Sequence, residues 1–246
     1  MKNSVFTSIL IAALCALTTH AQTLADSQFI AAPNWEIAVG VGSMELDKGR
    51  FGIDDSGMGL NLGIRFSDSS TPVDAEWRLY GTTLSFNDGV YSVPDDPRGG
   101  TYDVYCNDGE YTLVGTDLSL LANFNRGGVL NPYVGLGFLY EGSRFEADVY
   151  KGNYHYGWPR HPEADWEEHG WTYLMRAGAD LRADSLYARL DASYIGEIYD
   201  EDDNGQFLLS GDIGAYFCPK VRADVFGHYF TEYKSFYIGV GLTVVL

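Results

Sequence analysis

Residues 236–246 constrain the fold most, because apolar residues alternate there with small or polar ones without a break. The apolar residues occupy every second position, and glycines, Tyr237, Thr243 and Val245 lie between them. A period of two places the two sets on opposite faces of a β-strand, so one face lies against lipid or a core. A strand that alternates up to its last residue is typical of a closed barrel, whose last strand pairs with its first.

Similar alternating runs recur along the chain. They begin near residues 35, 58, 74, 117, 132, 171, 186, 209, 221 and 236. The connections are alternately long and short, and the longest lead into the runs at 117 and 171. Barrels that cross an outer membrane show this pattern. We therefore predict an all-β, antiparallel up-and-down transmembrane barrel of about ten strands over residues 35–246, with eight strands as the alternative.

The face opposite the apolar residues carries acids and arginines but no lysine. A soluble, lipocalin-like barrel would turn its apolar face inward and expose this face to water, where lysine is expected. Arginine suits a confined network instead, because its rigid fork pairs with carboxylates. We therefore place this face in the lumen and predict a lumen network of Glu36, Arg65, Glu76, Arg78, Asp117, Arg176, Asp180, Arg189, Asp191, Asp212, Arg222, Asp224 and His228.

The beginning of the chain has the pattern of a secretory signal peptide. Lys2 precedes an apolar run over residues 5–17, and small residues end the segment at Ala21. The apolar run is shorter than the roughly twenty residues that a membrane-spanning helix needs. We expect a signal peptide over residues 1–21 and a short periplasmic segment over residues 22–34. Cys106 and Cys218 fall at opposite ends of the predicted barrel, so no disulfide is expected.

Two short motifs resemble a known family. Residues 131–137 read Asn-Pro-Tyr-Val-Gly-Leu-Gly, and the last strand carries Gly241, Val244 and Leu246. The first resembles a strand start, and the second the terminal insertion signal, of the small outer-membrane barrels of Gram-negative bacteria, the OmpA-like and opacity-type superfamily. Leu246 stands where that group often has Phe. The resemblance implies a monomer in the cell outer membrane, surrounded by lipid and lipopolysaccharide and inserted by the barrel-assembly machinery.

The predicted lumen indicates a structural rather than a transport role. Acids and arginines nearly balance, and Tyr80, Tyr187, Tyr216 and Phe226 face walls rich in glycine. Such bulk predicts a filled polar lumen. The alternative is a small cation-preferring pore, which would be expected to carry an excess of one sign of charge. The formal charge of −18 excludes a nucleic-acid partner.

The long connections are acidic, which predicts an acidic extracellular cap. One of them is rich in aromatic residues, and such surfaces make adaptable contacts with proteins. A structural or surface-recognition role follows, with an extracellular partner as one expectation and a loop packed on itself as the alternative. The candidate contact residues are Tyr154, Tyr156, Trp158 and Trp166.

The sequence contains few residue patterns that are typical of catalysis or of metal binding. His228 with Asp224 or Glu232 could form an acid–base pair, but the residue patterns of omptin-type proteases and lipid A deacylases are missing. An outer-membrane hydrolase is therefore the less favoured alternative, and we predict neither an enzyme nor a cofactor. Residues 200–205 copy the first half of a calcium loop, but Gly211 stands where its last ligand belongs, so no metal site is predicted.

Overall fold

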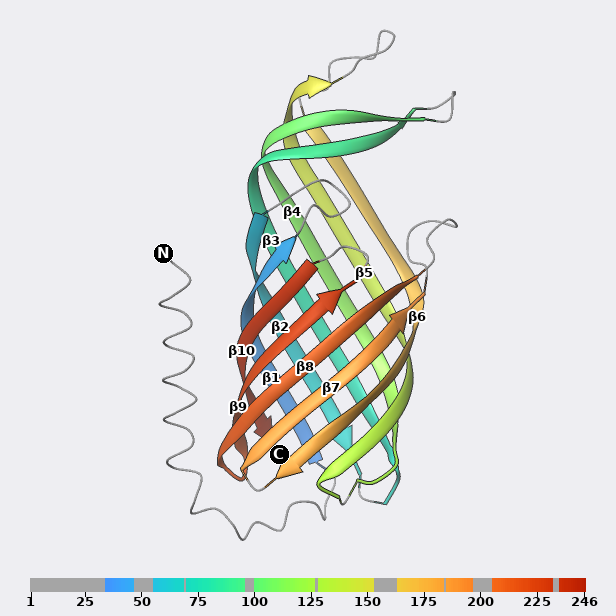
Figure 1. Cartoon of the computed structure of the whole chain (residues 1–246), viewed down its shortest axis with the longest axis vertical. Helices are drawn as coiled ribbons and strands as arrows, with labels where there is room; N and C mark the ends of the chain where they lie inside the picture. Colours follow the sequence, from blue (N-terminus) through green and yellow to red (C-terminus); the bar gives the residue numbers. More distant parts are fainter. Residues whose placement is uncertain are drawn as a thin grey trace.

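The computed structural model describes residues 34–46, 55–68, 70–95, 100–126, 128–152, 163–183, 185–196, 205–231 and 235–246. Neighbours in sequence pair antiparallel, and the last strand pairs with the first, so the barrel is closed (Figure 1). The prediction of a ten-stranded all-β barrel is confirmed, rather than the alternative of eight strands. The strands are β1 (Asn34–Leu46), β2 (Asp55–Ser67), β3 (Val73–Asp95), β4 (Gly100–Asn123), β5 (Leu130–Gly152), β6 (Glu163–Ala183), β7 (Leu186–Ile195), β8 (Gln206–Cys218), β9 (Val221–Phe230) and β10 (Ser235–Val245).

Among the residues described, no helix is long and apolar enough to cross a membrane.

Glycines line the seam where β10 meets β1. Gly40 pairs with Gly241, and the chain end is fixed because the Leu246 N–H donates to the Trp35 carbonyl at 2.9 Å. The Phe226 ring lies directly on this wall, since a Cβ added at Gly40 would come within 2.4 Å of its Cε1. The smooth wall therefore makes room for a large side chain inside the barrel.

The outward face of the barrel is apolar and exposed over most of its height. Leu60, Leu136 and Leu190 are 66%, 67% and 72% exposed. Burying apolar surface is worth about 25 cal/mol per Å², so a continuous belt of this kind favours a lipid surrounding over water. Aromatic residues mark both ends of the belt, as membrane interfaces require: Trp35 packs on Phe66 at 4.8 Å between ring centroids, and Trp171 is 71% exposed near the other end.

The two ends of the barrel differ. At the turn end, short connections join β2 to β3, β4 to β5, β6 to β7 and β8 to β9. In one of them the Ser70 N–H donates to the Asp68 carboxylate at 2.9 Å, which holds the pKa of that carboxyl below its ordinary value.

At the opposite end β3–β6 continue far beyond their neighbours (Figure 1). Among the described residues, the pairing of β2 with β3 stops at Thr83, and that of β7 with β6 starts at Leu174. Past these points the four strands form a sheet of their own. We call it the outer wall: residues 84–95, 100–112, 144–152 and 163–173. The long connections expected before residues 117 and 171 are therefore mostly strand, which corrects the prediction of loops there.

Where the strands enter the outer wall, the apolar residues change from the outward face to the inward face. In the barrel, β3 turns Trp77 outward and buries Glu76 inward, whereas in the outer wall it exposes Ser85 and buries Leu84 and Phe86. This inversion is what a strand passing from lipid into water requires. Phe86 stacks on Phe145 of β5 at 5.3 Å between centroids, so the wall has a small core of its own.

Candidate functional site in the barrel lumen

Charged side chains fill the half of the lumen at the turn end, and Arg176 on β6 stands at their centre. Its Nη1 donates to Glu76 at 2.7 Å, its Nη2 to Asp117 at 3.1 Å and its Nε to Ser193 at 3.3 Å. No part of the Arg176 side chain is exposed (0%). Buried guanidinium groups need such a full set of acceptors, because an unpaired charge in a confined space is costly. The residue ties β6 to β3, β4 and β7.

Two further arginines connect strands that are far apart in the sequence. Arg65 on β2 donates to Asp74 at 2.7 Å and, through Nη1, to Asp180 on β6 at 2.9 Å. Arg189 on β7 donates through Nη1 to Glu76 on β3 at 2.7 Å. The bonds from Arg65 to Asp180 and from Arg189 to Glu76 cross the inside of the barrel. The side chains that they join are largely buried. The ion pairs therefore cross the lumen as well as lining it.

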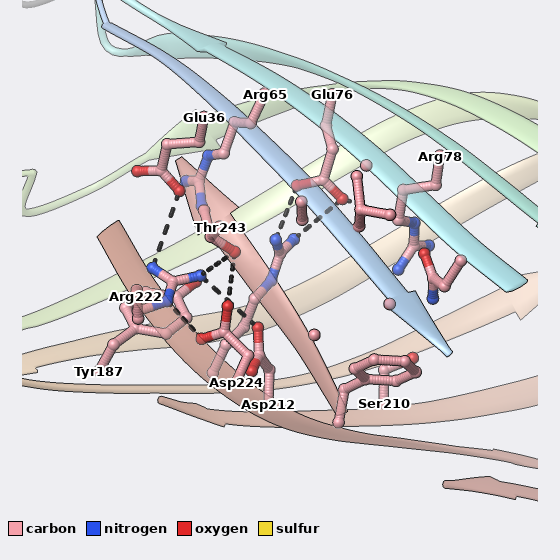
Figure 2. Close-up of a pocket in the computed structure, with 18 of the residues that line it drawn as sticks. Glu36, Arg65, Glu76, Arg78, Tyr187, Ser210, Asp212, Arg222, Asp224 and Thr243 are labelled. Atoms are coloured by element: carbon pink, nitrogen blue, oxygen red, sulfur yellow. Dashed lines mark hydrogen bonds and ion pairs between the residues drawn. The ribbon is translucent and has the colours of Figure 1, made fainter. Parts of the chain in front are cut away.

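A second cluster lies beside the glycine seam, around Arg222 of β9 (Figure 2). The guanidinium carbon lies 3.7 Å from the centre of the Tyr187 ring, and the group also pairs with Asp224. Asp224 accepts a further hydrogen bond from Thr243 at 2.5 Å, and Glu36 approaches Arg222 at 4.0 Å. Stacking and ion pairing together hold Arg222 in one orientation.

The structure brings all the charged residues of the predicted network together, each within 4.0 Å of an opposite charge. Asp74, Tyr133, Arg182, Ser193 and Thr243 also belong to this network, although they are not in the predicted set. Their inward position in the alternation was the available signal for most of them. Ser193 and Thr243 are uncharged, so nothing else in the sequence indicated that they belong to the network.

His228 is in the lumen but outside the ion pairs. Its Nδ1 lies 3.0 Å from the Ser210 hydroxyl and its Nε2 lies 3.3 Å from the Asn61 amide nitrogen. Both ring nitrogens therefore have a polar neighbour, and neither of these neighbours is a carboxylate. Among the described residues, the expected pair with Asp224 is not formed, and Glu232 lies outside them.

Two cavities meet at this histidine. The larger, of about 120 Å³, lies among the charged residues and is lined by Glu36, Arg189 and Asp212 among others (Figure 2). The smaller, of about 40 Å³, lies on the side of the outer wall. Asn61, Arg78 and His228 border both.

Beyond His228, toward the outer wall, the lumen holds an apolar cluster beside buried polar residues such as Glu141, which accepts a hydrogen bond from Tyr80 at 2.7 Å. Five buried side chains from five strands pack into one cluster, each with 1–6% of its surface exposed, and Tyr80 packs against them. We call this cluster the apolar section: Leu139, Leu174, Ile195, Leu208 and Phe230. The predicted polar lumen therefore also contains an apolar cluster. The lumen has a charged section toward the turn end and an apolar section toward the outer wall.

The outward face of the outer wall is acidic. Arg144 pairs with Glu146 and Asp165, and all three side chains are about half exposed or more. An open groove of about 510 Å³ runs along this face, with Glu146 and Asp165 among its lining residues. Within the ranges the structure describes, no cluster of histidine, cysteine and acidic side chains has the arrangement of a metal site.

The four predicted contact residues of the cap divide into two groups. Trp166 lies on β6, paired with Phe145 on β5, and so belongs to a strand rather than to the expected loop. Tyr154, Tyr156 and Trp158 lie outside the described residues, as do residues 1–33 and 197–204 with the signal peptide and the half calcium loop.

A closed barrel with a lipid-facing belt, short turns at one end and a paired charged lumen defines a transmembrane protein of the outer membrane. The chain belongs to the family described as outer membrane protein beta-barrel domain, whose pattern matches residues 10–242. The resemblance to OmpA-like outer-membrane barrels and the location in the cell outer membrane are thereby confirmed. In outer-membrane barrels the short turns face the periplasm and the longer connections face the exterior. The family implies a surrounding of membrane lipid and lipopolysaccharide.

Solved structures of the same kind match over most of the chain. The outer membrane protease OmpT from Escherichia coli is 12% identical, with a TM-score of 0.63, and the match covers 89% of this chain and all of OmpT (100%). OprG from Pseudomonas aeruginosa is 14% identical over 90% and 99% of the two chains, with a TM-score of 0.41. Ail from Yersinia pestis is 10% identical over 88% and 100%, with a TM-score of 0.37. No curated protein sequence matches. At these identities the likeness establishes the fold alone, and protease activity is not carried over from OmpT.

Proposed function

We propose that this barrel has a structural or surface-recognition role and that its lumen does not conduct ions. The observation that supports the closed lumen is the apolar section, to which β5–β9 each contribute a buried side chain and against which Tyr80 of β3 packs. An ion that enters from the periplasm loses its hydration shell there without gaining ligands. The alternative of a small cation-preferring pore requires a continuous polar path through the same cross-section.

Single-channel recording in planar bilayers tests the closed lumen. The purified barrel is expected to give no steady conductance steps. Replacing Phe230, which is 5% exposed in the apolar section, by alanine is expected to produce or increase conductance. The matched control is Phe236→Ala, since Phe236 is 43% exposed on the outer face. Steady cation-selective steps from the unmodified protein would establish the pore instead.

Recognition is assigned to the outer wall and its aromatic connection. The wall presents exposed carboxylates outside the membrane and rests on a core that includes Phe86 and Phe145, so it offers a firm surface to a partner. Tyr154, Tyr156 and Trp158 continue the chain beyond β5 and supply aromatic contact area. The expected partner is extracellular, and a basic surface would complement the acids.

Labelling of intact cells tests the orientation on which recognition depends. A cysteine introduced by Glu167→Cys, at an exposed position of the outer wall, is expected to react with a membrane-impermeant maleimide. Cys218, exposed at the opposite end, is the internal control and is expected to react only after the outer membrane is permeabilised. Cys106 is replaced by serine in the Glu167→Cys protein and in the parent protein that lacks this substitution. The reverse labelling pattern would contradict a role of the wall in recognition.

The remaining expectations concern assembly and catalysis. We infer that the mature protein begins after Ala21, that the barrel-assembly machinery inserts it, and that it is a monomer. A hydrolase is disfavoured because the hydrogen-bonding neighbours of His228 are Asn61 and Ser210 rather than a carboxylate that would make it a general base. Hydrolytic activity that disappears with His228→Ala while the barrel stays folded would reopen this alternative.

A further inference from the structure

The outer wall has a free sheet edge along β6. β5 pairs with β6 as far as Glu163, whereas the pairing of β7 with β6 starts at Leu174. Among the described residues, no strand therefore lies on the other side of β6 over residues 163–172, where β6 forms the border of the wall (Figure 1). Such an edge is a template on which another extended chain can pair.

The alternation of the backbone shows which residues present their hydrogen-bonding groups to this edge. The Tyr173 carbonyl accepts from the Gly196 N–H at 3.1 Å, so Tyr173 turns its backbone groups away from β5. In an antiparallel sheet the N–H and C=O of one residue point to the same side, and successive residues alternate. The residues that present both groups to the free edge are therefore Asp165, Glu167, His169 and Trp171.

The side chains of these four residues are exposed on the outward face of the wall, and the two farthest from the barrel are acids. An antiparallel strand on this edge would place its own side chains on the same face, with Cβ atoms about 5 Å from theirs. Opposite charges at such positions stabilise the pairing, and like charges destabilise it. The edge therefore favours a segment with basic residues opposite Asp165 and Glu167 and an aromatic residue opposite Trp171.

Charge also decides among the candidate occupants of the edge. A second copy paired through its own β6 edge would set acids against acids. Residues 197–204, which follow β7 in the chain, carry five acids and no base, so they have the wrong sign too. The other border of the wall, β3, includes Pro94, which lacks the N–H that a paired strand donates. The occupant that fits is a basic segment of another protein.

We propose that the β6 edge of the outer wall binds a basic, extended segment of another protein by antiparallel strand addition. The segment becomes a further strand of the wall and continues its antiparallel order. Its lysine or arginine side chains lie opposite Asp165 and Glu167. This inference rests on the proposed recognition role, since it names the edge and the class of partner for the same surface.

Fluorescence anisotropy of a synthetic peptide, added to the full-length barrel in detergent, tests strand addition. The probe has seven residues, with tyrosine first, lysine fifth and seventh, and threonine elsewhere. In antiparallel pairing its lysines lie opposite the two acids and bond to the edge through their own backbone N–H groups. Saturable binding is expected. Methylating these two backbone nitrogens should weaken it at least tenfold, whereas methylating those of the fourth and sixth residues, which face away from β6, should leave it unchanged.

Two changes in the protein address the same edge. His169→Pro removes an N–H that faces the edge rather than β5, so it is expected to abolish binding while the barrel stays folded. Its matched control, His169→Thr, keeps the N–H and is expected to bind like the unmodified protein. Glu167→Lys is expected to weaken binding several-fold. Its control is Glu110→Lys, at an exposed position of β4 away from the edge, where a much smaller effect is expected.

Heat-modifiable migration on a gel verifies that each variant is a folded barrel. The absence of saturable binding, equal effects of the two methylation patterns, or full binding by His169→Pro would each overturn strand addition. Equal losses from Glu110→Lys and Glu167→Lys would do so as well, yet would leave the acidic face as the recognition surface. A dimer in detergent that His169→Pro dissociates would show a second copy on the edge and refute the basic partner. The labelling of intact cells tests the recognition role separately.

Discussion

Removing the cation at the centre of the charged section tests whether the lumen is a low-dielectric interior or a water-filled channel. Arg176→Met keeps most of the apolar length of the side chain and deletes the guanidinium. Glu76 and Asp117 then lose hydrogen bonds of 2.7 and 3.1 Å. Breaking a buried ion pair from one side costs about 3–5 kcal/mol, since the remaining charge is left without compensation. We expect a loss of that size in the free energy of unfolding.

Arg144 on the outer wall is the matched control, because it too contacts two carboxylates. Its side chain is 54% exposed, whereas that of Arg176 is 0% exposed. Exposed pairs contribute less than about 1 kcal/mol, so Arg144→Met is expected to have little effect. Arg176→Lys should fall between the two, since a single ammonium group cannot reproduce the fork that reaches Glu76, Asp117 and Ser193.

Reversible urea unfolding in lipid vesicles, followed by tryptophan fluorescence, measures these differences. Heat-modifiable migration on a gel reports independently whether each variant is folded. Equal, small losses for Arg176→Met and Arg144→Met would mean that water screens the lumen charges, and the description of the charged section as a closed interior would then be wrong.

Three further predictions concern packing, membrane contact and pH. Gly40→Ala should destabilise the barrel by about 1–3 kcal/mol in the same urea assay, because the new Cβ would meet Phe226 at 2.4 Å, whereas Gly63→Ala, with its nearest contact at 3.6 Å, should be nearly neutral. Leu136→Arg should cost about 2–4 kcal/mol in vesicles if the outward face of β5 lies near the bilayer centre. The pKa of Asp68, measured by NMR titration, should lie below its ordinary value, so the stabilisation from its turn is present above the unfolded-state pKa and is lost as pH falls through the lowered one.

The barrel itself was predictable because lipid imposes a pattern on single strands. Ile238, Val240 and Leu242 alternate with residues that face the lumen, and the structure shows all three 42–53% exposed on the outside. The same rule identified the lumen charges. When the apolar neighbours of an arginine in a strand face the lipid, the arginine itself faces the lumen. Local alternation therefore indicated both the location of the protein and most of the charged members of the network.

The connections within the network were not predictable in this way. Arg176 and Glu76 are separated by 100 positions, and Arg65 and Asp180 by 115. Which arginine meets which acid depends on the register and tilt of strands on opposite walls. A single sequence shows the sign and the face of each charge but not its height in the barrel. Partner choice is therefore a property of the closed fold.

The outer wall was missed for a different physical reason. A search for strands with apolar residues outside fails where strands leave the bilayer, because water reverses the preference of each face. On β3, Leu84 and Phe86 continue the inward positions of Glu76 and Arg78, so the alternation itself never stops. What changes is the face that carries the apolar residues. The position of this inversion along a strand marks the height at which the chain leaves the lipid.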